Sequence, residues 1–110
     1  MKVIHTSGKR KSAIARATLS AGNGLVRVNS QLLPTIEPLL ARSKMEEPLL
    51  IAGESAKNVD INVQVMGGGT ISQADVTRLA IAKALATYDK RLQKDFLSYD
   101  RTLLVADVRL

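Results

Sequence analysis

Three adjacent cations, Lys9-Arg10-Lys11, are the residues of this chain whose type and spacing point most directly to chemistry. They follow Gly8, and no acidic residue occurs before Glu37. Like charges on one segment repel each other, so the fold gains nothing from such a cluster. A polyanionic partner does gain, through Coulomb attraction and the release of counterions. A solvated loop is the alternative interpretation, and phosphate binding is the better supported one.

The excess positive charge lies entirely in the first third of the chain. The protein has 110 residues and a formal net charge of +6. Residues 1–36 contain six basic and no acidic side chains, whereas residues 37–110 contain ten of each. Nucleic acid is therefore the first hypothesis for a partner, and the N-terminal segment, which also contains Arg16 and Arg27, is where contacts are expected.

A run of three glycines, Gly67, Gly68 and Gly69, forms a second candidate site between an expected strand and an expected helix. Backbone N–H groups in such a run can approach an anion closely, and a helix N-terminus adds partial positive charge. We expect an anion-binding turn here rather than a turn that only reverses the chain. A small nucleotide-phosphate-binding enzyme is a rival interpretation, but the lysine of the P-loop pattern is missing. A free-standing regulator that binds RNA or DNA generally is a further alternative.

The remaining composition disfavours catalysis, metal binding and membrane insertion. His5 is the only histidine and there is no cysteine, so a triad or a zinc site would need partners from distant segments. Aromatic residues make up only 3% of the chain, which counts against stacking of unpaired bases. No apolar run approaches the roughly 20 residues that cross a bilayer. We expect a non-enzymatic, cytoplasmic protein without cofactor, metal or membrane partner.

Alternation of apolar and polar residues predicts the strands that position these side chains. Lys2–Thr6 and Ser12–Ser20 are expected as strands on either side of a turn-prone break at Ser7–Lys11. Val59–Met66 is the clearest strand of the chain, with its odd-numbered residues facing one side.

A β-hairpin is expected from Ser12–Ser20 and Leu25–Val28, because Gly22-Asn23-Gly24 between them tolerates positive φ. Arg16 and Arg27 flank this hairpin and are expected to project from one sheet.

Helices are expected in the rest of the chain. Three prolines should divide Gln31–Gly53 into short helical pieces, with a capping box at Ser43–Glu46 and a stop at Gly53. A long helix is expected from about Ile71, capped by Thr70 or Ser72, with Asp75 in its first turn. Its buried stripe should contain Val76, Leu79, Ala82 and Ala86. A short helix around Leu92, Phe96 and Tyr99 and a last strand at Thr102–Ala106 complete an α+β sandwich.

These segments, in this order, resemble the family of the ninth protein of the small ribosomal subunit, in its archaeal form. The resemblance covers almost the whole chain and rests on Thr6–Ala17, Gly22–Asn29, Ile36–Pro38, Glu47–Leu49, Val65–Gly69, Gln73–Ala74, Arg78–Leu85 and Tyr99–Asp107.

The resemblance implies a two-layer α/β sandwich of the type shared with the second domain of the fifth small-subunit protein. That fold has a left-handed βαβ crossover, although such crossovers are generally right-handed. It also implies a place in the head of the small subunit, on the 3′ major domain of its rRNA and beside other head proteins. The implied RNA-binding residues are Gly8, Lys9, Arg10, Lys11, Arg16, Arg27, Gly67, Gly68, Gly69, Arg78 and Arg101.

Members of this family continue beyond the region of Asp107 with a long basic tail that reaches toward the peptidyl-site tRNA. The sequence given ends at Leu110, and Val108 stands where the family usually has proline. We therefore expect contact with tRNA only through such a tail and not from these 110 residues.

Overall fold

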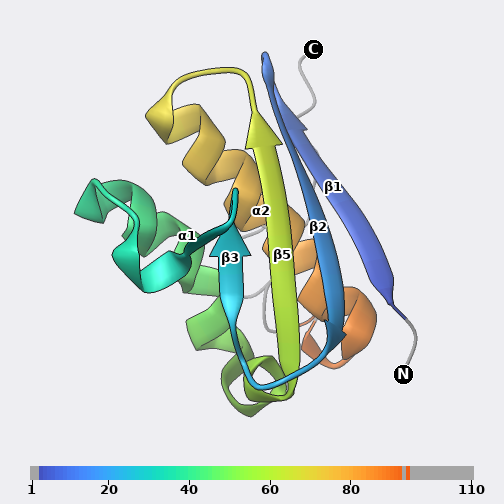
Figure 1. Cartoon of the computed structure of the whole chain (residues 1–110). Helices are drawn as coiled ribbons and strands as arrows, with labels where there is room; N and C mark the ends of the chain where they lie inside the picture. The colour runs from blue at the N-terminus through green and yellow to red at the C-terminus, as the bar shows by residue number, and fades with distance from the viewer. Residues whose placement is uncertain (1–2, 93, 95–110) are drawn as a thin grey trace.

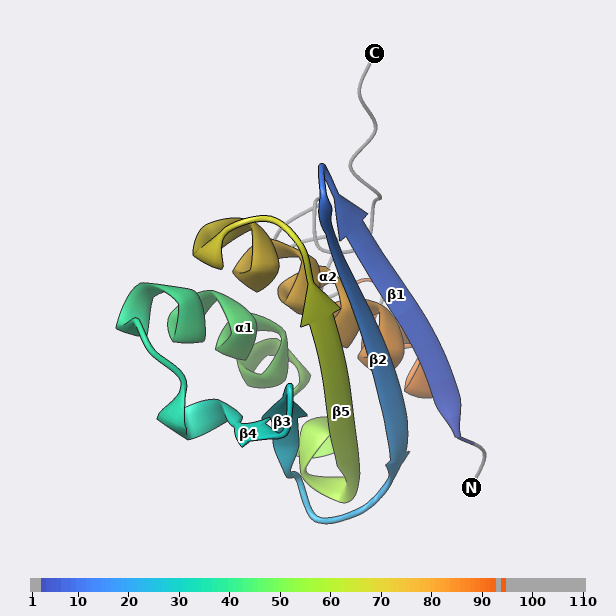
Figure 2. The same ribbon diagram turned by 45° about the horizontal axis from the view of Figure 1, so that its top comes forward.

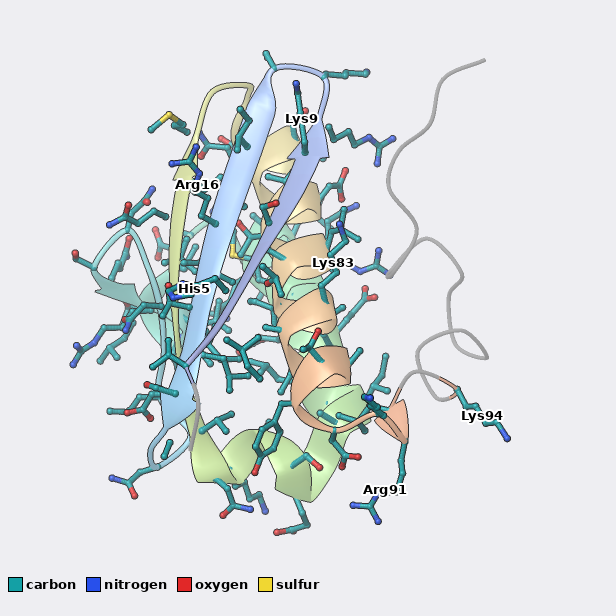
Figure 3. All side chains as sticks on the ribbon, turned by 90° about the vertical axis from the view of Figure 1, so that its right-hand side faces the viewer. His5, Lys9, Arg16, Lys83, Arg91 and Lys94 are labelled. Atoms are coloured by element: carbon teal, nitrogen blue, oxygen red, sulfur yellow. The ribbon has the colours of Figure 1, made fainter. Side chains whose placement is uncertain are left out.

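One sheet and two helices form two layers in the computed structural model, which describes residues 3–92 and 94 (Figure 1). The helices cover one face of the sheet, and among the described residues the other face has no helix on it (Figure 3). The strands are β1 Ile4–Arg10, β2 Ala13–Ala21, β3 Val26–Val28, β4 Gln31–Leu32 and β5 Val59–Met66. The helices are α1 Leu39–Ala52 and α2 Thr70–Tyr88, with short 3₁₀ turns at Leu33–Thr35 and Gly53–Asn58. The expected α+β sandwich is confirmed.

The strand order is β1-β2-β5-β3-β4, and it corrects the expected hairpin. β2 pairs antiparallel with β1 on one side and with β5 on the other. β3 lies on the far side of β5 and runs parallel to it. The segment Ser7–Lys11 is also not a break, because β1 continues through Arg10 and turns only at Lys11-Ser12.

Asp60 explains why the chain after β2 does not fold back on that strand. The Asp60 Oδ1 atom accepts hydrogen bonds from the backbone N–H groups of Asn23 at 2.9 Å and Leu25 at 3.0 Å. The Gly22 and Gly24 N–H groups bond to the carbonyls of Asn58 and Val59. These contacts carry the connection across the beginning of β5, so that β3 joins the sheet beyond it.

Asp60 should make stability depend on acidity. The N–H groups of Asn23 and then Leu25 hold the pKa of Asp60 below its ordinary value of 3.8. The folded state therefore binds this proton less tightly than the unfolded chain, so the stabilisation is present above about pH 4 and is lost as the pH falls through the folded pKa. Asp60→Ala should lower the melting temperature at pH 7 and flatten its decline below pH 4, measured by thermal unfolding over a pH series. An identical pH profile in the variant would contradict this assignment.

The connection from β3 through α1 to β5 is left-handed. In Figure 1 the parallel strands β3 and β5 both point upward, β5 lies to the right of β3, and α1 passes behind the sheet. A connection that moves to the right behind the sheet has a left-handed sense. In Figure 2, where the top of the view is brought forward, α1 appears above β3, as expected for a helix behind the sheet of Figure 1. The expected exception to the usual handedness is confirmed.

The core lies between the helix-facing side of the sheet and α2. The odd-numbered residues of β5 are buried as expected, and Ala13, Ala15 and Ala17 of β2 are buried with them. The expected stripe of α2 is also buried: Val76, Leu79, Ala82 and Ala86. Small side chains on both elements let the helix pack close to the sheet.

Gly8 shows how close this approach is. A Cβ atom added at Gly8 would lie 2.7 Å from the Val76 carbonyl oxygen of α2. Glycine is therefore required where β1 passes under α2.

Three expectations about helix ends are wrong, and one is confirmed. Pro48 lies inside α1, where it removes one N–H donor without ending the helix. Because α1 begins at Leu39, the expected capping box at Ser43 falls in its interior. α2 has Gly69 at its N-cap and no capping side chain. Gly53, with φ of 58°, ends α1 as expected.

Two expected elements near the C-terminus are outside the part that the structure describes. They are the strand Thr102–Ala106 and most of the helix expected around Leu92, Phe96 and Tyr99, of which only Leu92 and Lys94 are described.

Candidate nucleic-acid interface

Strand alternation separates the three cations of the basic cluster. Lys9 is exposed on the helix-free face of the sheet, whereas Arg10 turns toward the helices. The Arg10 guanidinium lies 3.3 Å from a carboxylate oxygen of Asp75, and Lys44 of α1 lies 3.1 Å from the other oxygen. Lys11 is exposed in the turn, with φ of 55°. The cluster therefore offers two cations to a partner and uses one in an ion-pair network.

The helix-free face carries further cations and very little negative charge. Arg16 lies opposite Ser7 and Gln64 in the register, and Arg27 lies opposite Asn62, so both project from one face as expected. Figure 3 shows the side chains of His5 and Arg16 on this side, away from α2. Asp60 is the one acidic residue within β1–β5, and its Oδ1 already accepts two backbone hydrogen bonds.

Three cations outside the sheet are held in ion pairs. Arg78 pairs with Glu47 at 2.9 Å, Arg91 with Asp89 at 3.1 Å, and Lys57 with Glu54 at 3.1 Å. Within residues 3–92 and 94, Lys9, Lys11 and Arg16 have no salt bridge. Their charges are available to an external anion, which is the electrostatic arrangement of a polyanion-binding surface.

Arg78 has a different environment from the other candidate residues. Its side chain is only 15% exposed, and it holds α2 to α1 through Glu47. Contact between Arg78 and RNA stays a prediction, and the ion pair already accounts for an arginine at this position. The candidate Arg101 lies beyond the described residues.

The three glycines of the run differ in whether the fold requires glycine there. Gly67 and Gly68 have φ of 79° and 65°, and a Cβ at Gly67 would overlap the Ser12 carbonyl oxygen. A Cβ at Gly68 would lie 2.9 Å from that of Ala13. This turn therefore packs against the β1–β2 turn, which explains both glycines without a ligand. Gly69, at the helix N-cap, has open space beside it.

Sequence reasoning missed the neutral polar residues of the sheet face. Asn62 and Gln64 are exposed on β5 beside Arg27 and Arg16. Strand alternation already placed them on the face of β5 that is opposite its buried valines. The pattern could have identified them as part of the site once the strands that pair with β5 were known. A hollow of about 450 Å³ lies between β1, β2 and β5 on this face.

The described residues contain no helix that is long and apolar enough to cross a membrane. Among the same residues, no group of three or more histidine, aspartate or glutamate side chains is placed to hold a metal ion.

The fold and this face define a small two-layer α+β protein with a cationic, acid-poor sheet surface. The model of the family Ribosomal protein S9/S16 matches residues 8–110, and the chain belongs to this family. It is 49% identical to the small ribosomal subunit protein uS9 of Methanococcus maripaludis strain C7, over 99% of this chain and 83% of that protein. It is 50% identical to the protein of the same name from Methanothrix thermoacetophila, over 99% of this chain and 84% of that one. The expected archaeal type is confirmed, and these matches do not favour the nucleotide-binding enzyme.

Proposed function

We propose that this protein is a non-enzymatic structural constituent of the small ribosomal subunit and binds small-subunit rRNA. The single observation that carries the RNA contact is that Lys9, Lys11 and Arg16, on the open side of the sheet and its turn, form no salt bridge among the described residues, while Asp60 is the one acidic residue in the five strands. Membership in the ribosomal family supplies the assembly in which such a surface has a partner.

The mechanism of this binding is charge neutralisation combined with shape. Segments of rRNA repel each other through their phosphates, and a protein that places Lys9, Lys11 and Arg16 between them lowers that repulsion. The sheet fixes where those charges lie, since Lys9 projects from β1, Arg16 from β2, which is paired on both sides, and Lys11 from the tight turn between these strands. The position in the subunit head, on the 3′ major domain and beside other head proteins of the cytoplasmic ribosome, is part of this proposal.

Salt dependence tests the charge-based mechanism. If Lys9, Lys11, Arg16 and Arg27 neutralise about four phosphates, log affinity for the rRNA domain should fall against log salt with a slope of about −3. Filter binding or fluorescence anisotropy over a salt series measures this slope. Co-sedimentation of the tagged protein with small subunits tests the assembly itself. A slope near zero would refute the charge-based mechanism, and absence from small subunits would refute the assignment to the ribosome.

A further inference from the structure

Two rows of polar side chains cross the helix-free face in register. One row runs from Ser7 of β1 through Arg16 of β2 to Gln64 of β5. The parallel row runs through His5, Thr18, Asn62 and Arg27, and so reaches one strand further. Neighbouring strands are about 4.8 Å apart, and residues two apart on a strand about 6.7 Å, so the rows form a regular lattice of hydrogen-bonding groups.

The hollow in this face is lined by members of both rows. His5, Ser7, Arg16, Thr18, Asn62 and Gln64 surround its volume of about 450 Å³. The His5 Nδ1 atom and the Thr18 hydroxyl lie 3.3 Å apart and satisfy each other. Within the described part of the chain, the side chains of Ser7, Arg16, Asn62 and Gln64 make no hydrogen bond to the protein. Four side chains with hydrogen-bond donors or acceptors therefore line one open hollow, and none of them is hydrogen-bonded to the described part of the protein.

The chemistry of this lattice selects the occupant. The side chains that this face turns toward the hollow are polar, and exposed apolar side chains lie at its margins, where Met66 is opposite Ile14 and Leu32 is opposite Arg27. The central rows thus lack the apolar core that a protein interface usually has. They offer an unpaired guanidinium for a phosphate, with hydroxyl and amide groups that match the donor and acceptor character of a ribose 2′-hydroxyl.

We propose that this hollow binds the sugar–phosphate backbone of an RNA segment that lies across the strands, with Arg16 on a phosphate and Asn62 and Gln64 on ribose hydroxyls. The inference rests on the proposed function, because it names the surface and the groups through which rRNA is bound. It adds the amides and Ser7, which carry no charge, to the residues that hold the RNA. These neutral groups distinguish RNA from DNA through the ribose 2′-hydroxyl, whereas the cations would bind any polyanion.

Two variants separate the charged from the neutral contacts. Arg16→Gln should weaken binding of the 110-residue chain to the rRNA domain about tenfold and make the salt slope shallower by about 0.7–0.9. The double variant Asn62→Ala, Gln64→Ala should weaken binding several-fold with the salt slope unchanged, since no charge is removed. It should also lose most of the preference for RNA over the 2′-deoxy form of the same sequence. Lys57→Gln, an exposed charge in the 3₁₀ turn before β5, is the matched control and should bind like the unmodified protein.

The outcomes distinguish the two proposals. If the unmodified chain binds rRNA while both face variants stay folded and bind equally well, this site is wrong and the proposed function stands. If the unmodified chain does not bind rRNA, both fail. A photo-crosslinking residue at position 64 in assembled subunits should link to rRNA, and a link to another ribosomal protein would overturn the choice of RNA as occupant. Should Arg16→Gln fail to fold, the amide double variant and the crosslink decide the matter.

Discussion

Replacing Gly67 by alanine should destabilise the protein by about 3 kcal/mol or more. An L-residue held at positive φ costs about 1–2 kcal/mol, and Gly67 has φ of 79°. The new Cβ would also overlap the Ser12 carbonyl oxygen, which is backbone and cannot rotate away. Overpacking of this kind typically costs a further 1–3 kcal/mol. Because small domains are stable by only about 5–15 kcal/mol, the melting temperature should fall by at least ten degrees or so.

Gly69→Ala is the matched control for this prediction. Gly69 has φ of −102°, and a Cβ there would meet nothing within 4 Å. Its melting temperature should therefore stay within about 2 °C of the unmodified protein, since such a substitution lies within ordinary surface effects. Equal losses in the two variants, measured by thermal unfolding, would contradict the structural role assigned to the turn.

The same pair tests the anion-binding interpretation of the glycine run. If rRNA phosphate approaches the backbone at Gly69, the added methyl group should weaken RNA binding while the fold stays intact. If the run is only a tight turn, Gly69→Ala should bind RNA normally. The geometry accounts for Gly67 and Gly68 without an anion, so Gly69 is the one of the three where this question can be answered cleanly.

Local sequence patterns predicted the bounds of individual strands better than they predicted which strands pair with each other. β5 occupies the predicted residues, Val59–Met66, because its strict alternation has a single explanation, a strand with one buried face. The hairpin between Ser12–Ser20 and Leu25–Val28 was wrong because pairing is a long-range property. The turn-prone residues Gly22–Gly24 are present, but Asp60, far along the chain, binds that segment and admits β5 between the two strands.

The handedness of the crossover came from family resemblance and not from residue patterns. Nothing in composition or periodicity distinguishes the two hands, and the general rule favours the other one.

The candidate site was predicted only in part, because the direction of each side chain depends on how the strands pair and pack. A run of cations in the sequence carries no information about which of its members face outward. Once β1 extends through the run, alternation sends Lys9 to the open face and Arg10 to Asp75. Likewise, the burial of Gly8 depends on where α2 crosses β1, which no local pattern contains.

The triple variant Lys9→Gln, Lys11→Gln, Arg16→Gln should lower affinity for the rRNA domain by about 100-fold or more. Each charge-assisted phosphate contact contributes about 1 kcal/mol or above, and three such losses amount to at least two orders of magnitude. Glutamine keeps much of the side-chain length and removes the charge. The fold should be little affected, because all three side chains are exposed and none takes part in a salt bridge among the described residues.

A second triple variant with the same change in net charge separates local contacts from overall charge. Lys57, Lys90 and Arg91 are exposed, and Figure 3 shows Arg91 at the opposite end of the molecule from Lys9. If binding follows net charge alone, glutamine at these three positions should cost as much affinity as the first triple variant. If the sheet side and its turn carry the interface, the second variant should lose less than about threefold. Equal losses in filter-binding titrations at one salt concentration would show that the protein attracts RNA only as a diffuse cation, because position on the fold would then have no effect.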